Sequence, residues 1–329
     1  MSATGQPASA TLVVRDLHVA YAAAGGGQIQ AVDGVTLSLR SGEALGLVGE
    51  SGCGKTTVAR AIAGLVKPQK GEIELDGATL ARRSRAQRRT IQLVFQDPFA
   101  SLNPRRTVRS VLAELLKVHE LAADDAQRER RCVELMEMVG LPAAALDRRP
   151  AAFSGGQRQR IAIARAIAVE PRMIVADEPM SALDVSVGAS ILGLFERLRN
   201  DLGLGLLLIS HNLAVVAAIC DRVAVMYLGR VVEEGPRAAV FADPRHPYTR
   251  ALLDAAPRLR PEASDGPRLR DEAPAAGARP AGCAFHDRCP RVEDICRRES
   301  PLLSPLAGQP NRAAACHFSD EPHTGGRAR

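Results

Sequence analysis

The sequence predicts an α/β fold in which a buried strand leads through a glycine-rich loop into a helix. Residues 44–48 form a short apolar run, and residues 57–65 carry apolar side chains at helical spacing. Between them, residues 49–56 match the pattern G-x-x-x-x-G-K-[ST] at every fixed position. Two later apolar runs, residues 173–176 and 205–210, read as further buried strands. Together these observations predict a sheet whose strands deliver loops to a phosphate-binding site.

Length and composition indicate a globular chain with one large domain and an appendage. The 329 residues are 46% hydrophobic, which is enough to bury a full core. No window of eighteen apolar residues occurs, and residues 1–10 lack a basic segment followed by an apolar one. We therefore expect neither a membrane span nor a secretory signal.

The basic charge of the chain fits a nucleic-acid partner or an anionic membrane surface, but only weakly. The formal charge of +6 is modest and spread out, and aromatic residues make up only 3% with no Trp, which argues against a base-stacking surface. The densest basic run, residues 82–89, reads as a solvated surface turn, with phosphate contact as the alternative.

The glycine-rich loop has the composition of a triphosphate site. Its glycines let successive backbone N–H groups turn onto one anion, and the following helix adds the positive end of its dipole. Lys55 brings a full charge to the β- and γ-phosphates, and the Thr56 hydroxyl is placed to bind Mg²⁺. Cys53 reads as a small neutral filler, with a redox-sensitive thiol as the alternative. The expected phosphate-binding residues are Gly49, Glu50, Ser51, Gly52, Cys53, Gly54, Lys55, Thr56 and Thr57.

Further strands are expected before and after the phosphate loop. Residues 11–15 and 35–39 have strand patterns and flank a glycine loop, and residues 72–75 alternate like an edge strand. Tyr21 precedes the glycine loop, so its ring is placed either to stack on an adenine or to pack in the core.

A helical insert follows the strand at residues 91–95. That strand ends at Gln96, two residues before a proline that cannot continue a strand ladder. Apolar residues then recur at helical spacing, which predicts a helical subdomain over about residues 97–170. Inside it a second anion cradle is expected, because two glycines behind a serine N-cap open a helix. Its residues are Ser154, Gly155, Gly156 and Gln157.

Two carboxylates and a histidine follow the buried strands. Ligands of open α/β sheets bind at the carboxyl ends of the strands, where Asp177 and Glu178 lie. Asp177 is placed to hold Mg²⁺ and Glu178 to polarise a water, with helix capping as the alternative for the pair. His211 ends the strand at residues 205–210, and taken alone it is more often a structural histidine.

In this order and at these spacings the motifs resemble the nucleotide-binding domain of ABC ATPases over roughly residues 11–250. The resemblance implies a P-loop NTPase core with an antiparallel β subdomain, a helical subdomain and a small cysteine-containing C-terminal extension. The motifs that carry it are residues 49–56, Gln96, residues 154–157, Asp177, Glu178, residues 181–184 and His211.

The same resemblance implies roles for individual residues. Two such domains meet head to tail and hold each ATP between the lysine loop of one and the Ser-Gly-Gly-Gln helix start of the other. Glu178 would be the catalytic base or the residue that orients the water, and His211 would contact the γ-phosphate. Gln96 would contact Mg²⁺ and the water and relay the nucleotide state to a transmembrane subunit. The resemblance also implies that Lys55, Thr56 and Asp177 hold phosphate and Mg²⁺, that Tyr21 stacks on adenine and that Asp184 belongs to the ATP site.

Three longer strings are similar to oligopeptide/dipeptide importers, especially to the second of their two ATPase subunits. They are residues 95–105, 181–186 and 246–253. The similarity implies an ATP-hydrolysing subunit for peptide import at the cytoplasmic face of the membrane. Its implied partners are a paralogous or identical ATPase subunit, two permease subunits and, indirectly, an extracytoplasmic substrate-binding protein. Nickel and glutathione importers share these features and remain alternatives. A soluble ABC ATPase acting on ribosomes or DNA is disfavoured, because the chain has neither a second nucleotide domain nor a long coiled-coil insert.

The tail divides into a linker and a cysteine-containing segment. We expect an ATPase domain over residues 1–255, a linker rich in Pro and Ala over 256–282, and an extension over 283–329 whose prolines force loops. Four cysteines in a short span have the composition of a metal site. The tail resembles those of peptide-importer ATPases that carry a [4Fe–4S] cluster. Such a cluster and free thiols are the leading interpretations, ahead of zinc and disulfides. The four cysteines are Cys283, Cys289, Cys296 and Cys316.

Overall fold

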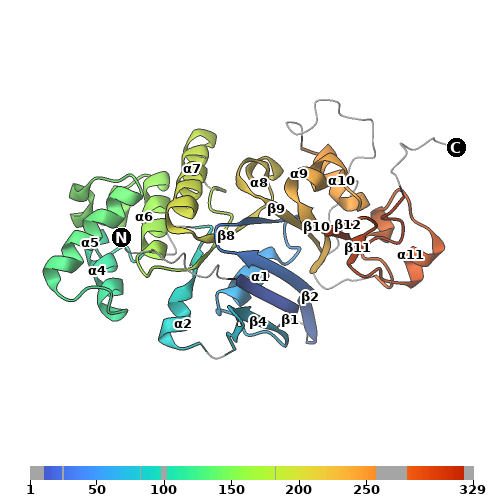
Figure 1. The fold of residues 1–329 in the computed structure, drawn as a ribbon, viewed down its shortest axis with the longest axis horizontal. Helices are drawn as coiled ribbons and strands as arrows, with labels where there is room; N and C mark the ends of the chain where they lie inside the picture. The colour runs from blue at the N-terminus through green and yellow to red at the C-terminus, as the bar shows by residue number, and fades with distance from the viewer. Residues whose placement is uncertain are drawn as a thin grey trace, which may run out of the picture.

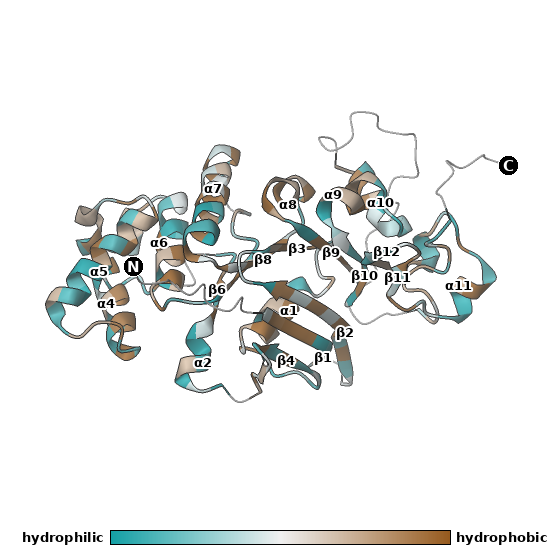
Figure 2. Cartoon of the chain, in the orientation of Figure 1, coloured by the Kyte–Doolittle hydropathy of each residue, from teal (hydrophilic) through white to brown (hydrophobic). Residues whose placement is uncertain are grey.

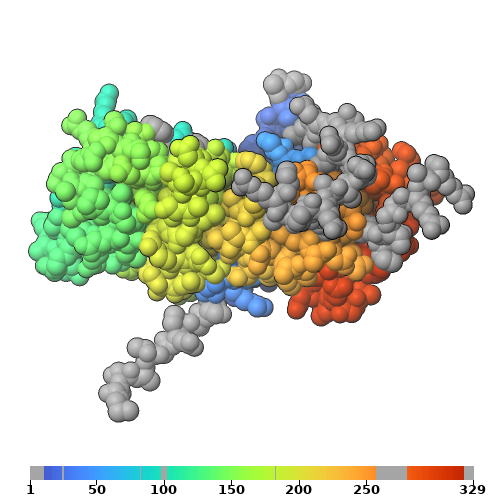
Figure 3. Space-filling model, turned by 90° about the horizontal axis from the view of Figure 1, so that it is seen from above, coloured from blue at the N-terminus to red at the C-terminus, as the bar shows by residue number. Residues whose placement is uncertain are grey.

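The structure is a computed structural model that describes residues 11–23, 26–81, 83–97, 102–181, 183–256 and 280–321. Figure 1 shows three parts in a row: a helical subdomain at one end, the sheets in the middle and the C-terminal extension at the other end. The view from above in Figure 3 shows the same order. Among the residues so described, no helix has both the length and the apolar composition of a membrane span.

The central sheet has eight strands in the order β11-β12-β10-β9-β3-β8-β7-β6. The five strands from β9 to β6 are parallel, whereas β10, β12 and β11 continue the sheet in antiparallel pairs. The bounds of the parallel strands are β3 (Ala44–Val48), β6 (Ile91–Val94), β7 (Met173–Asp177), β8 (Gly205–Ser210) and β9 (Arg222–Tyr227). The others are β10 (Arg230–Pro236), β11 (Ser304–Leu306) and β12 (Gln309–Ala314).

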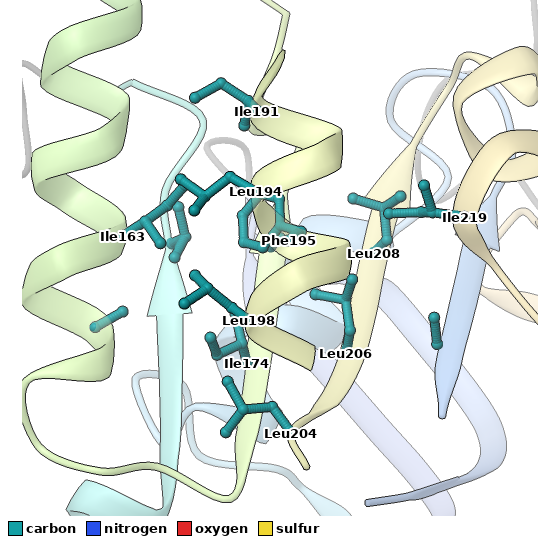
Figure 4. Close-up of a cluster of buried hydrophobic side chains, with 14 of the residues drawn as sticks. Ile163, Ile174, Ile191, Leu194, Phe195, Leu198, Leu204, Leu206, Leu208 and Ile219 are labelled. Carbon is teal, nitrogen blue, oxygen red and sulfur yellow. The ribbon is translucent and has the colours of Figure 1, made fainter. Parts of the chain in front are cut away.

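Both faces of the parallel strands are buried, which explains their continuous apolar sequences. On one face, Figure 4 shows Phe195 and Leu198 packing near Leu206 and Leu208. On the other face, Leu207 and its neighbours pack into a second cluster with the N-terminal strands and α1. Figure 2 shows hydrophobic residues along β3, β8 and β9, while α2 is largely hydrophilic. The helices that cover the sheet include α1 (Lys55–Ile62), α6 (Gly155–Ile167), α7 (Val185–Leu202) and α8 (Leu213–Ile219).

A smaller antiparallel sheet has the order β2-β1-β4-β5. Its strands are β1 (Thr11–Ala22), β2 (Gln28–Arg40), β4 (Lys70–Leu75) and β5 (Ala78–Thr79). The expected edge position of residues 72–75 is wrong, because β4 lies between β1 and the two-residue β5. The expected surface turn at residues 82–89 is also wrong. Residues 85–90 form helix α2 (Arg85–Thr90), which begins at a capping box between Ser84 and Gln87, while residue 82 lies outside the described ranges.

A helical subdomain lies between β6 and β7 in the chain. It contains α4 (Val108–Val118), α5 (Asp125–Met138), two short 3-10 turns and α6. The apolar residues Leu112, Leu116 and Leu135 are fully buried between these helices. The turns are η1 (Ala143–Asp147) and η2 (Pro150–Ala152).

The C-terminal extension joins the central sheet, because β12 pairs with β10. It follows α9 (Arg237–Ala242) and α10 (Pro247–Asp254) and includes η3 (His286–Arg288) and α11 (Asp294–Arg298). Pro305 was expected to force a loop, but it lies in β11, which is the edge strand of the central sheet among the described residues. An edge strand tolerates a proline because the missing N–H can face away from the sheet. Most of the expected linker, residues 257–279, lies outside the described residues.

Candidate functional site

The phosphate loop leads from β3 into α1, and its glycines are required by backbone geometry. Gly54 has φ +108°, and a Cβ there would lie 2.3 Å from the carbonyl oxygen of Ala31. Gly49 has φ +154°, and its Cβ would lie 2.2 Å from the carbonyl oxygen of Met226. Any side chain at these positions would collide with neighbouring backbone, so the glycine pattern reflects close approach as well as conformation.

Lys55 is buried and bound to the loop itself. Its Nζ donates to the carbonyl oxygens of Gly49 at 2.7 Å and Glu50 at 2.8 Å. Cys53 is also buried, and burial raises the pKa of its thiol, so the thiol stays neutral. The geometry favours the small-filler interpretation of Cys53 over a reactive thiolate.

A hydroxyl and a carboxylate meet beside the loop. Thr56 Oγ1 donates to Asp177 Oδ1 at 3.1 Å. Burial raises the pKa of the Asp177 carboxyl, and the charge of Glu178 adds to this, whereas the Thr56 hydrogen bond opposes it. Two hard oxygen ligands next to a phosphate site suit Mg²⁺, which is commonly held by one or two protein oxygens together with substrate phosphates.

Glu178 is held in an unusual backbone conformation with its carboxylate between two side chains. Its φ is +45°, in the left-handed region that non-glycine residues rarely adopt. Nε2 of Gln96 lies 3.4 Å from Oε2, and Nδ1 of His211 lies 3.1 Å from Oε1. The structure thus brings together three residues that lie on separate segments of the sequence.

Tyr21 lies at the end of β1 beside the loop. Its hydroxyl donates to Thr57 Oγ1 at 3.4 Å, while the residue remains 39% exposed. The ring is therefore not part of the core, and its open face is compatible with stacking on a base.

The second anion cradle lies elsewhere on the chain. Ser154 caps α6 and forms a capping box with Gln157. A Cβ at Gly155 would lie 3.2 Å from the Leu183 side chain, and one at Gly156 would lie 2.4 Å from the Val187 side chain. This helix start therefore lies beside the segment that contains the exposed Asp184. No hydrogen bond or ion pair joins residues 154–157 to residues 49–56 in the part of the chain that the structure describes.

Family models match most of the chain in two parts. Residues 32–181 match the ABC transporter family, and residues 232–296 match the family of the oligopeptide/dipeptide transporter C-terminal region. A putative peptide import ATP-binding protein of Brucella abortus is 48% identical over 93% of this chain and 92% of that protein. The oligopeptide transport ATP-binding protein AppF of Bacillus subtilis is 45% identical over 89% and 90%.

The chain belongs to the ABC transporter ATP-binding family. Solved structures agree with this assignment. A dimeric structure of the ATP-binding cassette MJ0796 with ADP and Pi has a TM-score of 0.62 and 30% identity, covering 69% of this chain and 98% of that chain. The structure of cbiO1 from Clostridium perfringens has a TM-score of 0.62 and 27% identity, with coverages of 76% and 94%. As a member of this family, the chain is an ATPase that uses Mg²⁺.

Outside the ATP site, the four cysteines of the extension line one small cavity. Burial raises the pKa of the Cys289 thiol to about 11, and it also raises the pKa of Cys283 and Cys316. None of the four forms a disulfide within the described part of the chain. Within the described ranges, however, no group of three or more His, Cys, Asp or Glu side chains is arranged to hold a metal ion.

Two residues that sequence reasoning did not place at the site also contact the phosphate loop. The hydroxyl of Tyr248 accepts a hydrogen bond from the Glu50 N–H at 2.8 Å. The Arg288 guanidinium binds both carboxylate oxygens of Glu50 at 2.9 Å. Tyr248 lies in residues 246–253, a segment that indicated the family but not a contact with the loop. Arg288 is 238 residues from Glu50, so no local sequence pattern could have paired Arg288 with Glu50.

Proposed function

We propose that this ATPase powers the import of di- or oligopeptides, as a peripheral subunit on the cytoplasmic face of the cell membrane. The carboxylate of Glu178, held between Gln96 and His211 beside the phosphate loop, is the observation that carries the catalytic part. The peptide part is supported by relatives that are named peptide import proteins and by the match of residues 232–296 to the transporter C-terminal region. Nickel and glutathione remain the alternative cargoes.

The catalytic proposal assigns a task to each polar group of the site. Phosphoryl transfer passes through a loose transition state, so catalysis is mainly positioning and charge stabilisation. Lys55 would exchange its two carbonyl partners for the β- and γ-phosphates. Thr56 and Asp177 would hold Mg²⁺, which supplies charge neutralisation at the phosphates when bound. Glu178 would orient and deprotonate the attacking water, with His211 and Gln96 fixing its two oxygens.

The separation of the two anion cradles supports a head-to-tail dimer. Residues 154–157 would bind the phosphates held by the loop of a second ATPase subunit, identical or paralogous. Val185, next to Asp184, is 81% exposed, as expected for a residue that a partner covers.

Ser51→Cys and Gln157→Cys together should give a crosslinked dimer with a bifunctional thiol reagent when ATP is trapped by Glu178→Gln. Each substitution alone is the control for the native cysteines, and absence of a new crosslink contradicts this arrangement for identical chains.

A groove beside the Gln96 segment supports a permease partner. It has a volume of about 1240 Å³ and is lined by residues of α1, β4, α2 and β6. Its lining includes Leu65, which is 59% exposed, and Phe95, which directly precedes Gln96. A permease segment seated here would contact the residue before the one that touches Glu178. We propose that this contact couples transport to hydrolysis. The extracytoplasmic binding protein would act on the ATPase only through the permeases.

We propose that the four cysteines are candidate ligands of a [4Fe–4S] cluster, with free thiols as the alternative. Their common cavity supports the first interpretation, whereas the arrangement described above does not form a finished metal site. We assign no catalytic step to a cluster.

Iron and sulfide analysis of anaerobically purified protein, native and Cys289→Ser, decides between a cluster and free thiols. Stoichiometric iron and sulfide that the substitution abolishes support the cluster, and iron-free native protein supports the thiols.

Uptake measurements test the transport function. Vesicles would contain this chain, its ATPase partner and two permease subunits, with the binding protein added outside. We expect ATP-dependent uptake of labelled di- or oligopeptide that Glu178→Gln abolishes. Uptake of Ni²⁺ or glutathione in place of peptide would reassign the cargo. Recovery of the protein with ribosomes and without permease would reject the transporter role.

A further inference from the structure

The contact between Arg288 and Glu50 joins the C-terminal extension to the phosphate loop. Two parallel hydrogen bonds of 2.9 Å run from the guanidinium to the two carboxylate oxygens. The side chain of Arg288 is 9% exposed and that of Glu50 is 22% exposed. Bidentate pairs of this kind are both strong and directional. A residue of the extension thus fixes a side chain that projects from the ATP-binding loop.

Aromatic rings enclose this ion pair. The Tyr227 and Tyr248 ring centroids are 4.5 Å apart, and Phe285 packs against both rings. The Arg288 guanidinium carbon lies 5.8 Å from the ring centroids of Tyr227 and Phe285. This apolar surround lowers the local dielectric constant, so the charges of the pair act more strongly on each other and on a nearby anion.

Four groups hold Glu50 in the structure, and ATP binding would remove one of them. Its N–H is bound by Tyr248 and its carboxylate by Arg288, while its carbonyl oxygen accepts from Lys55 Nζ and, at 3.4 Å, from the Cys53 N–H. Once the Lys55 ammonium moves to the phosphates, Tyr248 and Arg288 are the two side chains that remain to fix this turn of the loop. An unpaired Glu50 carboxylate would then place a negative charge on the loop that must receive a triphosphate.

We propose that Arg288 is a positioning residue for ATP: by pairing with Glu50, it neutralises a carboxylate of the phosphate loop and holds the loop in its binding conformation. The C-terminal extension thereby becomes part of the nucleotide site. The inference rests on ATP binding at residues 49–56 and is independent of the transported substrate.

Nucleotide affinity of Arg288→Gln tests the proposal in the full chain. We expect about tenfold weaker ATP binding, from one uncompensated charge near the phosphates at an intermediate dielectric constant. The loss should be larger for ATP than for ADP, and it should shrink as KCl is raised, because salt screens repulsion between partly exposed charges. A merely structural defect would weaken both nucleotides alike and would not respond to salt in this way.

Matched variants separate charge compensation from disruption of the extension. Arg291→Gln removes another ion pair of the same extension, the 2.6 Å contact with Glu321, and should leave ATP affinity unchanged. The double variant Glu50→Gln, Arg288→Gln should bind ATP more tightly than Arg288→Gln alone, because the orphaned charge is gone. Arg288→Lys should retain part of the affinity.

The outcomes are distinguishable. Native affinity in Arg288→Gln, or a double variant weaker than Arg288→Gln, would overturn the proposal while leaving the ATP site intact. Native protein that binds no nucleotide would overturn the ATP site and the proposal together.

Discussion

His211 Nδ1 and Glu178 Oε1 lie 3.1 Å apart, although the two residues follow different strands of the central sheet. Strands β7 and β8 are adjacent and parallel, so their carboxyl ends deliver both side chains to one place. Gln96, which follows the neighbouring β6, approaches the other carboxylate oxygen. The candidate site is thus assembled at the ends of neighbouring strands of one sheet, and we expect substitutions in it to separate binding from hydrolysis.

Glu178→Gln should leave ATP binding intact and nearly abolish hydrolysis. The amide keeps the size of the side chain but cannot accept a proton, and loss of a general base costs about a thousandfold in rate. Stopped assays of phosphate release, with ATP affinity measured in parallel, check this. Glu196→Gln on the exposed face of α7 is the matched control. Robust turnover by Glu178→Gln would remove Glu178 from its assigned role.

His211→Ala should lower the turnover rate by about a hundredfold, the typical cost of losing one donor that stabilises developing charge. The KM for ATP should change much less, because the loop provides most of the binding. Steady-state kinetics separate the two parameters, with His119→Ala in the helical subdomain as the control. An effect confined to KM would show that His211 contributes binding only.

Mg²⁺-dependent nucleotide binding should weaken as the pH falls. Burial raises the pKa of the Asp177 carboxyl, so protons compete with Mg²⁺ for this ligand at a higher pH than for an ordinary aspartate. Titration of Mg²⁺ in the presence of ATP at several pH values measures the effect. Asp177→Asn should lose both the affinity and this component of the pH dependence, and an unchanged pH profile in that variant would contradict the assignment.

Arg312→Leu should destabilise the fold by about 3 kcal/mol, because it leaves a buried carboxylate without its cation. Arg312 Nη2 lies 3.3 Å from Oε1 of Glu233, which is fully buried. Denaturant unfolding measures the loss, with the exposed Arg298→Leu as the control. A loss below about 0.5 kcal/mol, the usual range for surface changes, would show that the pair contributes little.

The same variant should show a characteristic pH dependence. Burial raises the pKa of the Glu233 carboxyl, and removal of Arg312 raises it further. The folded variant then binds a proton that the unfolded chain releases, so its free energy of unfolding decreases as pH rises. The deficit relative to native protein should therefore shrink as the pH falls from about 8 to about 5. A deficit that grows over this range would contradict the assignment.

Local patterns predicted the parts of the molecule whose physical causes are local. The buried runs at residues 44–48 and 205–210 coincide with β3 and β8, since strands covered on both faces must be continuously apolar. Residues 173–176 fall one residue short of β7. The glycine pattern located the phosphate loop, because only glycine fits its close backbone approaches.

Long-range pairing accounts for what the sequence did not reveal. The position of β4 inside its sheet depends on β5, which is too short to give a strand pattern. The basic run was expected as a turn from its charges alone, whereas Ser84 and Gln87 form the capping box that starts α2. The contact between Glu50 and Arg288 depends on how the extension docks, and charged residues so far apart carry no periodicity that links them.

The pairing of β12 with β10 bears on how the protein is made. Glu233 and Glu234 of β10 pair with Ala314 and Ala313, so one side of β10 is completed by a strand that the ribosome adds only after residues 237–308. Until then the nascent sheet ends in a rim of unsatisfied backbone groups, to which strands of other nascent chains can bind. A halt in translation before residue 309 would make that rim permanent, and the shortened product should be a substrate for chaperones and proteases.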